Sequence, residues 1–168
     1  MAPMQCYTNR FFRYLLRKLS SKAITWTEME KASDILSSDS ACERRLRHSA
    51  DEGPMAVLQL GGSDVGRMAR AAALGSKYGF GEININCGCP SIETGGADYG
   101  AALMSRADTV RQVCHAVAEE SGLPVSIKVE ATLLFIVPVQ RPLWCLSSPL
   151  EITAGMSFPI HDPRHPCH

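Results

Sequence analysis

Short apolar segments that alternate with helix-forming segments are the feature that most restricts the fold of this chain. The runs MAVLQLGG at 55–62, EININC at 82–87 and VSIKV at 125–129 have the length and composition of buried strands. Helical periodicity fills both intervals between them, and Gly122 supplies a stop signal for the second helix. This rhythm predicts an α/β protein with a parallel sheet, either open or closed into a barrel.

The N-terminal part of the chain extends the same pattern. RFFRYLLRKLS at 10–20 has an apolar stripe at helical spacing, and AITWTEM at 23–29 has the composition of a strand. With APM at 2–4 counted as a minimal first strand, five strands precede residue 130. A complete (β/α)8 barrel typically needs about 250 residues, whereas this chain has 168. We therefore expect a partial (β/α)8 TIM barrel of five βα units or an open doubly wound sheet.

A change in composition near residue 130 marks the predicted domain boundary. Residues 1–129 form the predicted partial barrel domain. Residues 130–168 hold six of the ten prolines but only five charged residues, and they lack a long helical pattern. Such a composition is typical of an irregular, poorly ordered tail rather than of additional sheet.

Charge and cysteine content argue against several classes of function. The 17 Lys and Arg residues balance the 17 Asp and Glu residues, so composition gives no basic field for nucleic acid. No apolar run approaches the ~20 residues of a membrane span, and no signal-peptide pattern is present. Seven cysteines without paired CxxC units indicate free thiols in a reducing compartment, cytoplasmic or organellar. The CxC of Cys87 and Cys89 lacks a second ligand pair, so we predict no metal site.

Three polar residues interrupt the predicted apolar strands near their carboxyl ends: Gln59, Asn86 and Lys128. A buried amide or ammonium group without a partner is costly, so each requires a ligand or a network. Parallel α/β proteins bind ligands at this edge of the sheet. Structural roles are the alternative. Gln59 would be a hydrogen-bonded core amide, Asn86 would cap the loop, and Lys128 would extend its charge to solvent. Their common placement favours a shared binding site.

Cys89 lies between Gly88 and Pro90, directly after the predicted strand at 82–87. Glycine permits unusual backbone dihedrals and proline fixes the next one, so we expect the thiol on a rigid turn. A cysteine held in this way suits a proton donor or a nucleophile. Cys87 is expected to be a small buried hydrophobe instead.

Several longer segments follow one another in a characteristic order. They are MAPMQCYTNRFFRYLLR, AVLQLGGSD, YGFGEININCGCPS, GGADYGAALM and PVSIKV. Together they resemble the tRNA-dihydrouridine synthases, and among these the DusA-like branch. The resemblance covers about residues 1–129. Its most specific elements are N-x-G-C-P-S at 86–91 and G-A-x-L-M at 100–104.

The resemblance implies a flavoenzyme of tRNA modification. In this family NADPH reduces an FMN bound in a TIM barrel, and hydride then passes to C6 of a uridine in tRNA. Cys89 corresponds to the family's general acid, which protonates C5 of the same ring. That role requires the neutral thiol form of the cysteine.

The resemblance also implies a set of cofactor-binding residues. Pro3 and Met4 belong to the segment that lies against the flavin, and Gln59 and Lys128 match flavin-binding positions. Asn86 matches the asparagine near both flavin and substrate base. A lysine ammonium group beside the flavin stabilises the negative charge of the reduced ring.

The family pattern stops after residue 129. Its flavin-contacting histidine, its phosphate-binding Gly/Arg segments and its helical RNA-binding domain are not found in residues 130–168. We therefore expect weak or no flavin retention by this chain alone. The alternatives are a non-catalytic fragment without cofactor affinity, an FMN barrel that acts on a free pyrimidine, and an RNA-binding module. The last would use the basic segments 9–18 and 43–48.

Overall fold

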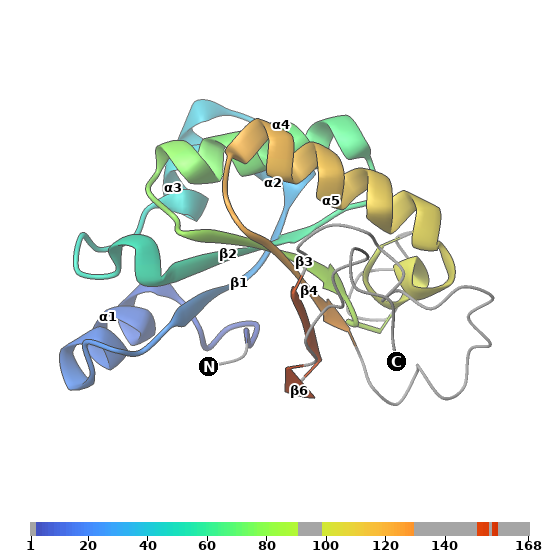
Figure 1. The fold of residues 1–168 in the computed structure, drawn as a ribbon. Coiled ribbons are helices and arrows are strands. Elements are labelled where there is room, and N and C mark those ends of the chain that lie inside the picture. Colours follow the sequence, from blue (N-terminus) through green and yellow to red (C-terminus); the bar gives the residue numbers. More distant parts are fainter. Residues whose placement is uncertain (1–2, 91–98, 130–150, 155, 158–168) are drawn as a thin grey trace.

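The structure, a computed structural model, describes residues 3–90, 99–129, 151–154 and 156–157. At its centre, four parallel strands follow one another in chain order (Figure 1). These strands are β1 (Thr25–Lys31), β2 (Ala56–Gly61), β3 (Glu82–Cys87) and β4 (Val125–Val129). Sequential parallel strands connected by helices are the arrangement of a TIM barrel. The predicted fold class, α/β with a partial barrel, is confirmed.

Helices cover one face of this sheet, and Figure 1 shows α2 (Ala32–Ile35), α4 (Val65–Lys77) and α5 (Ala107–Ser121) above the strands. The carboxylate of Asp64 caps α4 by accepting a hydrogen bond from the Arg67 N–H at 2.7 Å. Gly122 ends α5 in the left-handed conformation, with φ 66°, as the sequence predicts. The helical elements that follow β1 are α2 (Ala32–Ile35), α3 (Asp39–Leu46), η1 (Gly53–Met55), α4 (Val65–Lys77), η2 (Gly100–Ser105) and α5 (Ala107–Ser121).

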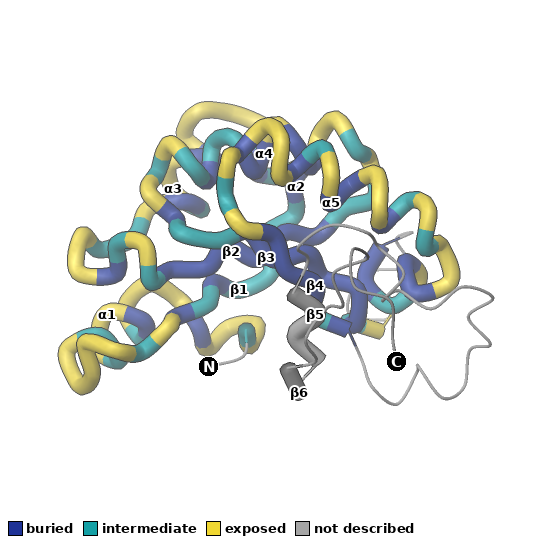
Figure 2. The backbone as a smooth tube through the Cα atoms, viewed as in Figure 1, coloured by how far each residue is buried: buried dark blue, intermediate teal, exposed yellow. Residues whose placement is uncertain are grey.

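The core lies between the sheet and this helix layer (Figure 2). All six residues of β2 are buried. Val110, Val113 and Val117 form the predicted apolar face of α5 and are completely buried. Gly75 in α4 allows close packing on β2, because a Cβ there would lie 2.7 Å from Leu58 Cδ2. A larger residue at this position would require the Leu58 side chain to shift or α4 to move.

The predicted N-terminal helix is present as α1 (Arg10–Leu19), but only Phe12 and Leu16 of its apolar stripe are partly buried, and the rest of the stripe is exposed. An amphipathic helix normally buries this stripe. In α1 the buried residue is Arg13, whereas Phe11, Leu15 and Leu19 are 68%, 52% and 75% exposed. A charged side chain therefore attaches this helix to the rest of the molecule.

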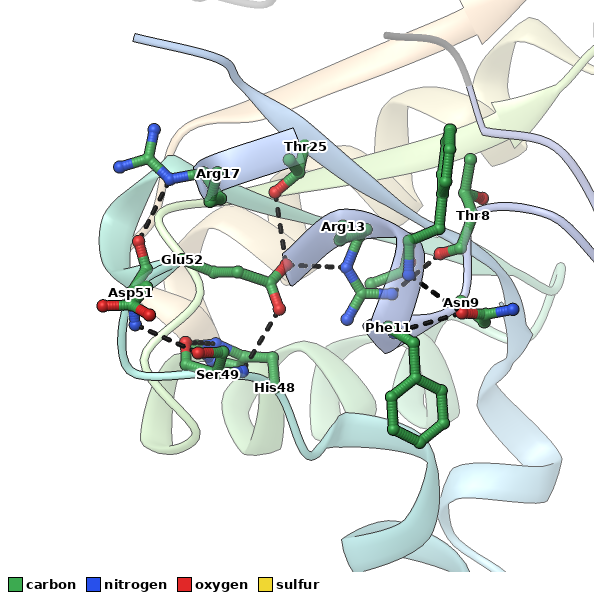
Figure 3. Close-up of polar contacts among 12 residues, drawn as sticks. Thr8, Asn9, Phe11, Arg13, Arg17, Thr25, His48, Ser49, Asp51 and Glu52 are labelled. Atoms are coloured by element: carbon green, nitrogen blue, oxygen red, sulfur yellow. Dashed lines mark hydrogen bonds and ion pairs between the residues drawn. The ribbon is translucent and has the colours of Figure 1, made fainter. Parts of the chain in front are cut away.

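The attachment is a buried ion pair between Arg13 and Glu52 (Figure 3). Arg13 Nε donates to Glu52 Oε2 at 2.7 Å, and the two side chains are only 5% and 0% exposed. The carboxylate also accepts hydrogen bonds from the Thr25 hydroxyl at 3.2 Å and the Ser49 N–H at 3.1 Å. Arg13 Nη1 donates to the Thr8 carbonyl at 2.8 Å. The cluster connects α1 to the start of β1 and to the turn before β2.

The two ends of the chain differ from the predicted pattern. Pro3 and Met4 are not part of a strand, so four strands rather than five are described up to Val129. Most of the predicted tail lies outside the described residues. Within it, β5 (Glu151–Ala154) pairs in parallel with β4, and β6 (Met156–Ser157) pairs antiparallel with β5. These two short strands were not expected from the composition of residues 130–168.

Within the part of the chain that the structure describes, none of the helices has the length and apolar character that crossing a bilayer requires.

The buried ion pair yields a test of stability. Replacement of Glu52 by Gln leaves the Arg13 guanidinium buried without a counter-charge. Removal of one partner of a buried pair typically costs about 3–5 kcal/mol. We expect Glu52→Gln to lower the free energy of unfolding by about that amount, as measured by urea denaturation.

The neighbouring Asp51 provides a matched control. Its side chain pairs with Lys18, but both side chains are about half exposed, at 49% and 51%. Exposed pairs contribute about 0–1 kcal/mol. Asp51→Asn should therefore change the unfolding free energy by less than about 1 kcal/mol. Equal effects of the two substitutions would contradict the role given to the Arg13–Glu52 pair.

Candidate active site

Polar residues of β2, β3 and β4 lie side by side on one face of the sheet. Gln59 is paired in register with Asn84, and Asn84 is paired with Ser126. The intervening residues Leu58 and Ile83 contact α4 at Gly75, so they face the helix layer. Successive side chains of a strand point to opposite faces. The polar row therefore occupies the face away from α4.

Hydrogen bonds connect this row into a continuous chain. Asn86 Nδ2 donates to Gln59 Oε1 at 3.2 Å, and Gln59 Nε2 donates to Asn84 Oδ1 at 2.7 Å. Asn84 Nδ2 in turn donates to the Ser126 hydroxyl at 2.8 Å, and that hydroxyl donates to the Glu82 carboxylate. Because each group accepts on one side and donates on the other, the carboxylate at the end fixes the orientation of every amide.

The four uncharged members of this chain are almost completely buried, at 0–1% exposure: Gln59, Asn84, Asn86 and Ser126. A buried polar group without a partner typically costs about 1–3 kcal/mol. A connected network avoids that cost and holds its members in one arrangement. Gln59 is thus a buried amide whose hydrogen bonds are satisfied, as its structural interpretation predicts. Through Asn86 it also belongs to the network that contacts Cys89.

The Asn86 side chain also forms the turn that carries the thiol. Its Oδ1 accepts hydrogen bonds from the N–H groups of Gly88 at 3.1 Å and Cys89 at 3.0 Å. Its Nδ2 donates to Cys89 Sγ at 2.8 Å. Asparagine commonly stabilises turns through such bonds to its own backbone neighbours. Asn86 is therefore both the predicted loop cap and a direct partner of the thiol.

The remainder of the turn is anchored to the segment that precedes α5. The Ala101 N–H donates to the Cys89 carbonyl at 2.8 Å. Gly100, next to it, has a positive φ of 68°, a conformation that glycine adopts without steric cost. Cys89 itself is partly exposed. The thiol is therefore held in place on both sides and remains accessible from outside.

Cys87 behaves as the predicted hydrophobe. Its side chain is completely buried within the apolar core. Burial raises the pKa of the Cys87 thiol well above its ordinary value, because the thiolate would lose its hydration. Burial likewise raises the pKa of Cys114 to about 12. Both remain neutral thiols at physiological pH, and they are free cysteines, as is Cys89.

Lys128 lies next to Asn86 in the register of β3 and β4. It is partly buried, and no hydrogen bond or ion pair joins it to another described residue. A partly desolvated ammonium group of this kind favours an anionic ligand. The cation and the thiol therefore lie at the carboxyl edge of adjacent strands. This donor set fits a flavin, whose reduced ring and phosphate are both negatively charged.

The other predicted cofactor residues are less clearly connected to this cluster. Pro3 is partly buried and Met4 is 43% exposed, in the segment before α1. The Met4 backbone N–H donates to the Thr8 hydroxyl, and the same hydroxyl donates to the Met4 carbonyl. Their contact with flavin stays a prediction. The side-chain amides of Gln59 and Asn86 form hydrogen bonds to other protein groups. In this structure they therefore hold the neighbouring side chains in position.

The Ser126 hydroxyl of this network was not predicted from the sequence. Ser126 lies two residues before Lys128, and Asn84 two residues before Asn86, so each pair shares a strand face. That spacing was the available signal. The Thr27 hydroxyl was also missed. It accepts the Gln59 N–H at 3.0 Å beside the register shift between Trp26 and Met29, which no periodicity predicts.

Two further observations define the chemistry of this edge. A cavity of about 170 Å3 lies where β1 and β2 end, lined among others by Lys31, Gly61, Arg67 and Tyr99. Its volume is too small for a whole flavin, and its lining holds two cations, Lys31 and Arg67, beside one carboxylate, Asp64. No group of three potential metal ligands occurs among the residues that the structure describes.

Comparison with known proteins identifies the family. A sequence profile named Dihydrouridine synthase (Dus) matches residues 1–133. The tRNA-dihydrouridine(20/20a) synthase of Synechocystis sp. is 41% identical over 128 residues, which are 76% of this chain and 37% of that protein. Proteins of the same name from Pseudomonas syringae pv. tomato and Salmonella typhi are 40% and 38% identical over 128 residues, with the same two coverages.

This chain therefore spans about 37% of the length of these relatives. The profile nevertheless covers the whole of the described barrel segment, including all four parallel strands, the asparagine network and the Cys89 turn. On this evidence the chain belongs to the dihydrouridine synthase family.

Proposed function

We propose that this chain carries the proton donor and part of the flavin site of an FMN-dependent tRNA-dihydrouridine synthase, with NADPH as reductant. The observation that carries the proposal is the hydrogen bond between Asn86 and Cys89, at the edge of the sheet next to Lys128. The relatives are named as tRNA-dihydrouridine synthases, which supports tRNA as the substrate. A cytoplasmic location fits that substrate.

Conversion of uridine to 5,6-dihydrouridine adds one hydride and one proton across the C5–C6 bond. FMN, when bound and reduced by NADPH, supplies the hydride for C6. The proton for C5 must come from a positioned acid, because negative charge develops at C5 as the hydride arrives. Cys89 Sγ is the acid in this proposal, and the proton leaves the sulfur for C5.

Asn86 assists this transfer through two effects of its side chain. Its Nδ2–H group points at the sulfur and stabilises the negative charge that remains after the proton has left. Its Oδ1 holds the backbone of the turn, so the sulfur keeps one position. Because Cys89 is partly exposed, water can return the proton between turnovers.

Lys128 is the cation of the proposed flavin site. Its positive charge at the carboxyl edge favours the anionic form of the reduced ring. The network through Gln59 and Asn84 keeps β2, β3 and β4 in the register that places this cation beside the turn. Pro3 and Met4 are proposed to contact the flavin from the N-terminal segment.

The alternative of an RNA-binding module has less support, because the basic segments use their cations internally. Arg13 pairs with Glu52, and Arg45 pairs with Glu30 and Asp34. A cavity of about 560 Å3 is lined by these two paired arginines and by three more, but three glutamates line it too: Arg10, Arg44, Arg47, Glu28, Glu30 and Glu43. Such mixed charge is unfavourable for a phosphate backbone.

The first test concerns the flavin. We expect the purified chain to hold less than one equivalent of FMN. When FMN is added, binding should quench the flavin fluorescence in a titration that saturates and gives a weak affinity. Lys128→Met should weaken that binding about 10–100-fold, the effect of losing one charged contact. Lys77→Met, at an exposed position of α4, is the matched control and should bind as the unaltered chain does. Stoichiometric copurified flavin would disprove the expected weak retention.

The second test concerns the acid. With saturating FMN and NADPH, we expect slow formation of dihydrouridine in unmodified tRNA, measured by mass spectrometry of nucleosides. Cys89→Ala should reduce the rate by about 10²–10⁴-fold, the usual contribution of a general acid. Cys114→Ala, a cysteine buried on α5, is the control that should retain activity.

Other results of the same assay distinguish the alternatives. Reduction of free uridine in preference to tRNA would indicate an enzyme of free pyrimidines. A complete lack of product at every FMN concentration would show that the chain is a non-catalytic fragment. A Cys89→Ala variant with unchanged activity would remove the thiol from the mechanism.

A further inference from the structure

The cavity of about 170 Å3 at the carboxyl edge of the sheet, here called the β1–β2 cavity, is separate from the turn of Cys89. It lies where β1 ends at Lys31 and β2 ends at Gly61, and these two residues are paired in register. The first turn of α4 forms another wall. None of the described residues that line it belongs to the hydrogen-bond network of Asn86. Parallel α/β proteins bind ligands at this edge.

Tyr99 brings to this cavity a polar group that lacks a hydrogen-bond partner. The residue is only 8% exposed, and its buried hydroxyl has no partner among the residues that the structure describes. Its ring lines the cavity, and Cε2, which is bonded to the carbon that carries the hydroxyl, lies 3.0 Å from where a Cβ of Gly61 would be. The hydroxyl end of the ring therefore lies at the cavity. Because buried hydroxyl groups nearly always have a partner, an occupant of the cavity is expected to supply it.

The charges that line the cavity favour an anion as this occupant. Lys31 and Arg67 contribute two cations, and neither forms an ion pair within the part of the chain that the structure describes. The carboxylate of Asp64 accepts the Arg67 N–H at 2.7 Å and so caps α4. The lining therefore has an excess of one positive charge, and the positive end of the α4 dipole adds to it.

The size of the cavity restricts the anion to a single small group. Pockets that take whole small molecules typically measure about 300–1,000 Å3, which is more than this cavity offers. Water alone would satisfy Tyr99 but would leave Lys31 and Arg67 without a counter-charge. A phosphate group accepts hydrogen bonds on all of its oxygens, so it suits donors from three segments: the end of β1, α4 and the residue before η2. A planar carboxylate offers fewer oxygens to the same donors.

We propose that the β1–β2 cavity is a phosphate-binding subsite, in which the Tyr99 hydroxyl, the Lys31 ammonium group and the Arg67 guanidinium group hold one phosphate group. The subsite binds phosphate whether or not Cys89 acts as the acid. Its assignment to a backbone phosphate of tRNA rests on the proposed function, in which the RNA approaches this edge of the sheet. A free phosphate is the other source of the same chemistry.

Titration of the full chain with inorganic phosphate tests the subsite without flavin or NADPH. Binding is followed by calorimetry at constant ionic strength, with acetate as the reference anion. We expect phosphate to bind saturably and acetate to bind at least tenfold more weakly. Tyr99→Phe removes only the hydroxyl and should weaken phosphate binding about tenfold. Lys31→Met should weaken it about 10–100-fold, the effect of losing one charged contact.

Two substitutions outside the cavity are the matched controls. Tyr7→Phe alters a residue that is 70% exposed, and Lys77→Met removes a cation from an exposed position near the other end of α4. Both variants should bind phosphate as the unaltered chain does. Since Tyr99→Phe removes a buried hydroxyl that has no protein partner, it should not lower the urea midpoint in phosphate-free buffer. Its weaker binding is then not a loss of folding.

Retention of unmodified tRNA on filters at moderate salt identifies the source of the phosphate. If the RNA backbone supplies it, inorganic phosphate competes with tRNA, and Tyr99→Phe weakens tRNA binding whereas Tyr7→Phe does not. Saturable phosphate binding with an unchanged tRNA affinity of Tyr99→Phe would support the subsite and assign it to a free phosphate.

Three results would overturn the proposal: no saturable binding of phosphate, acetate that binds as tightly as phosphate, or phosphate binding that Tyr99→Phe or Lys31→Met leaves unchanged. Phosphate binding that is lost in these two variants, in a chain that forms no dihydrouridine, would support the subsite while contradicting the proposed function.

Discussion

The four hydrogen bonds of the Asn86 side chain connect the sheet to the turn that holds the thiol. One amide group orients Gln59, the backbone at Gly88 and Cys89, and the sulfur itself, so a change at this residue affects all of them. The amide is in turn held by strand pairing on both sides of β3. The position of Cys89 is therefore a property of the whole sheet rather than of the loop.

The two faces of the sheet follow different physical rules. On the helix face, Leu58 and Ile83 pack against α4, and stability comes from apolar burial. On the opposite face, amides and a hydroxyl are equally buried, and they are tolerated because they satisfy one another. A parallel sheet that must present polar groups at its carboxyl edge needs such a network, since water does not reach these groups.

Strands and helices were predictable from local pattern because each depends on a short window. The segment of alternating apolar and polar residues at 82–87 became β3, and the Gly122 signal ended α5 where expected. Gln59, Asn86 and Cys89 were selected because polar groups at strand ends are exceptional. Ser126 and Thr27 were not selected, since a hydroxyl is common in strands and becomes significant only through its partner. The Arg13–Glu52 pair joins residues 39 positions apart, and no local pattern predicts such a contact.

The sequence by itself determined the α/β rhythm, the carboxyl-edge location of the polar residues and the turn between Gly88 and Pro90. These features follow from residue size, polarity and backbone freedom within a few positions. The tertiary structure decided which polar groups meet and which face of α1 is turned outward. Both depend on strand register and on a buried charge pair, because contacts between distant segments exist only once the chain has folded.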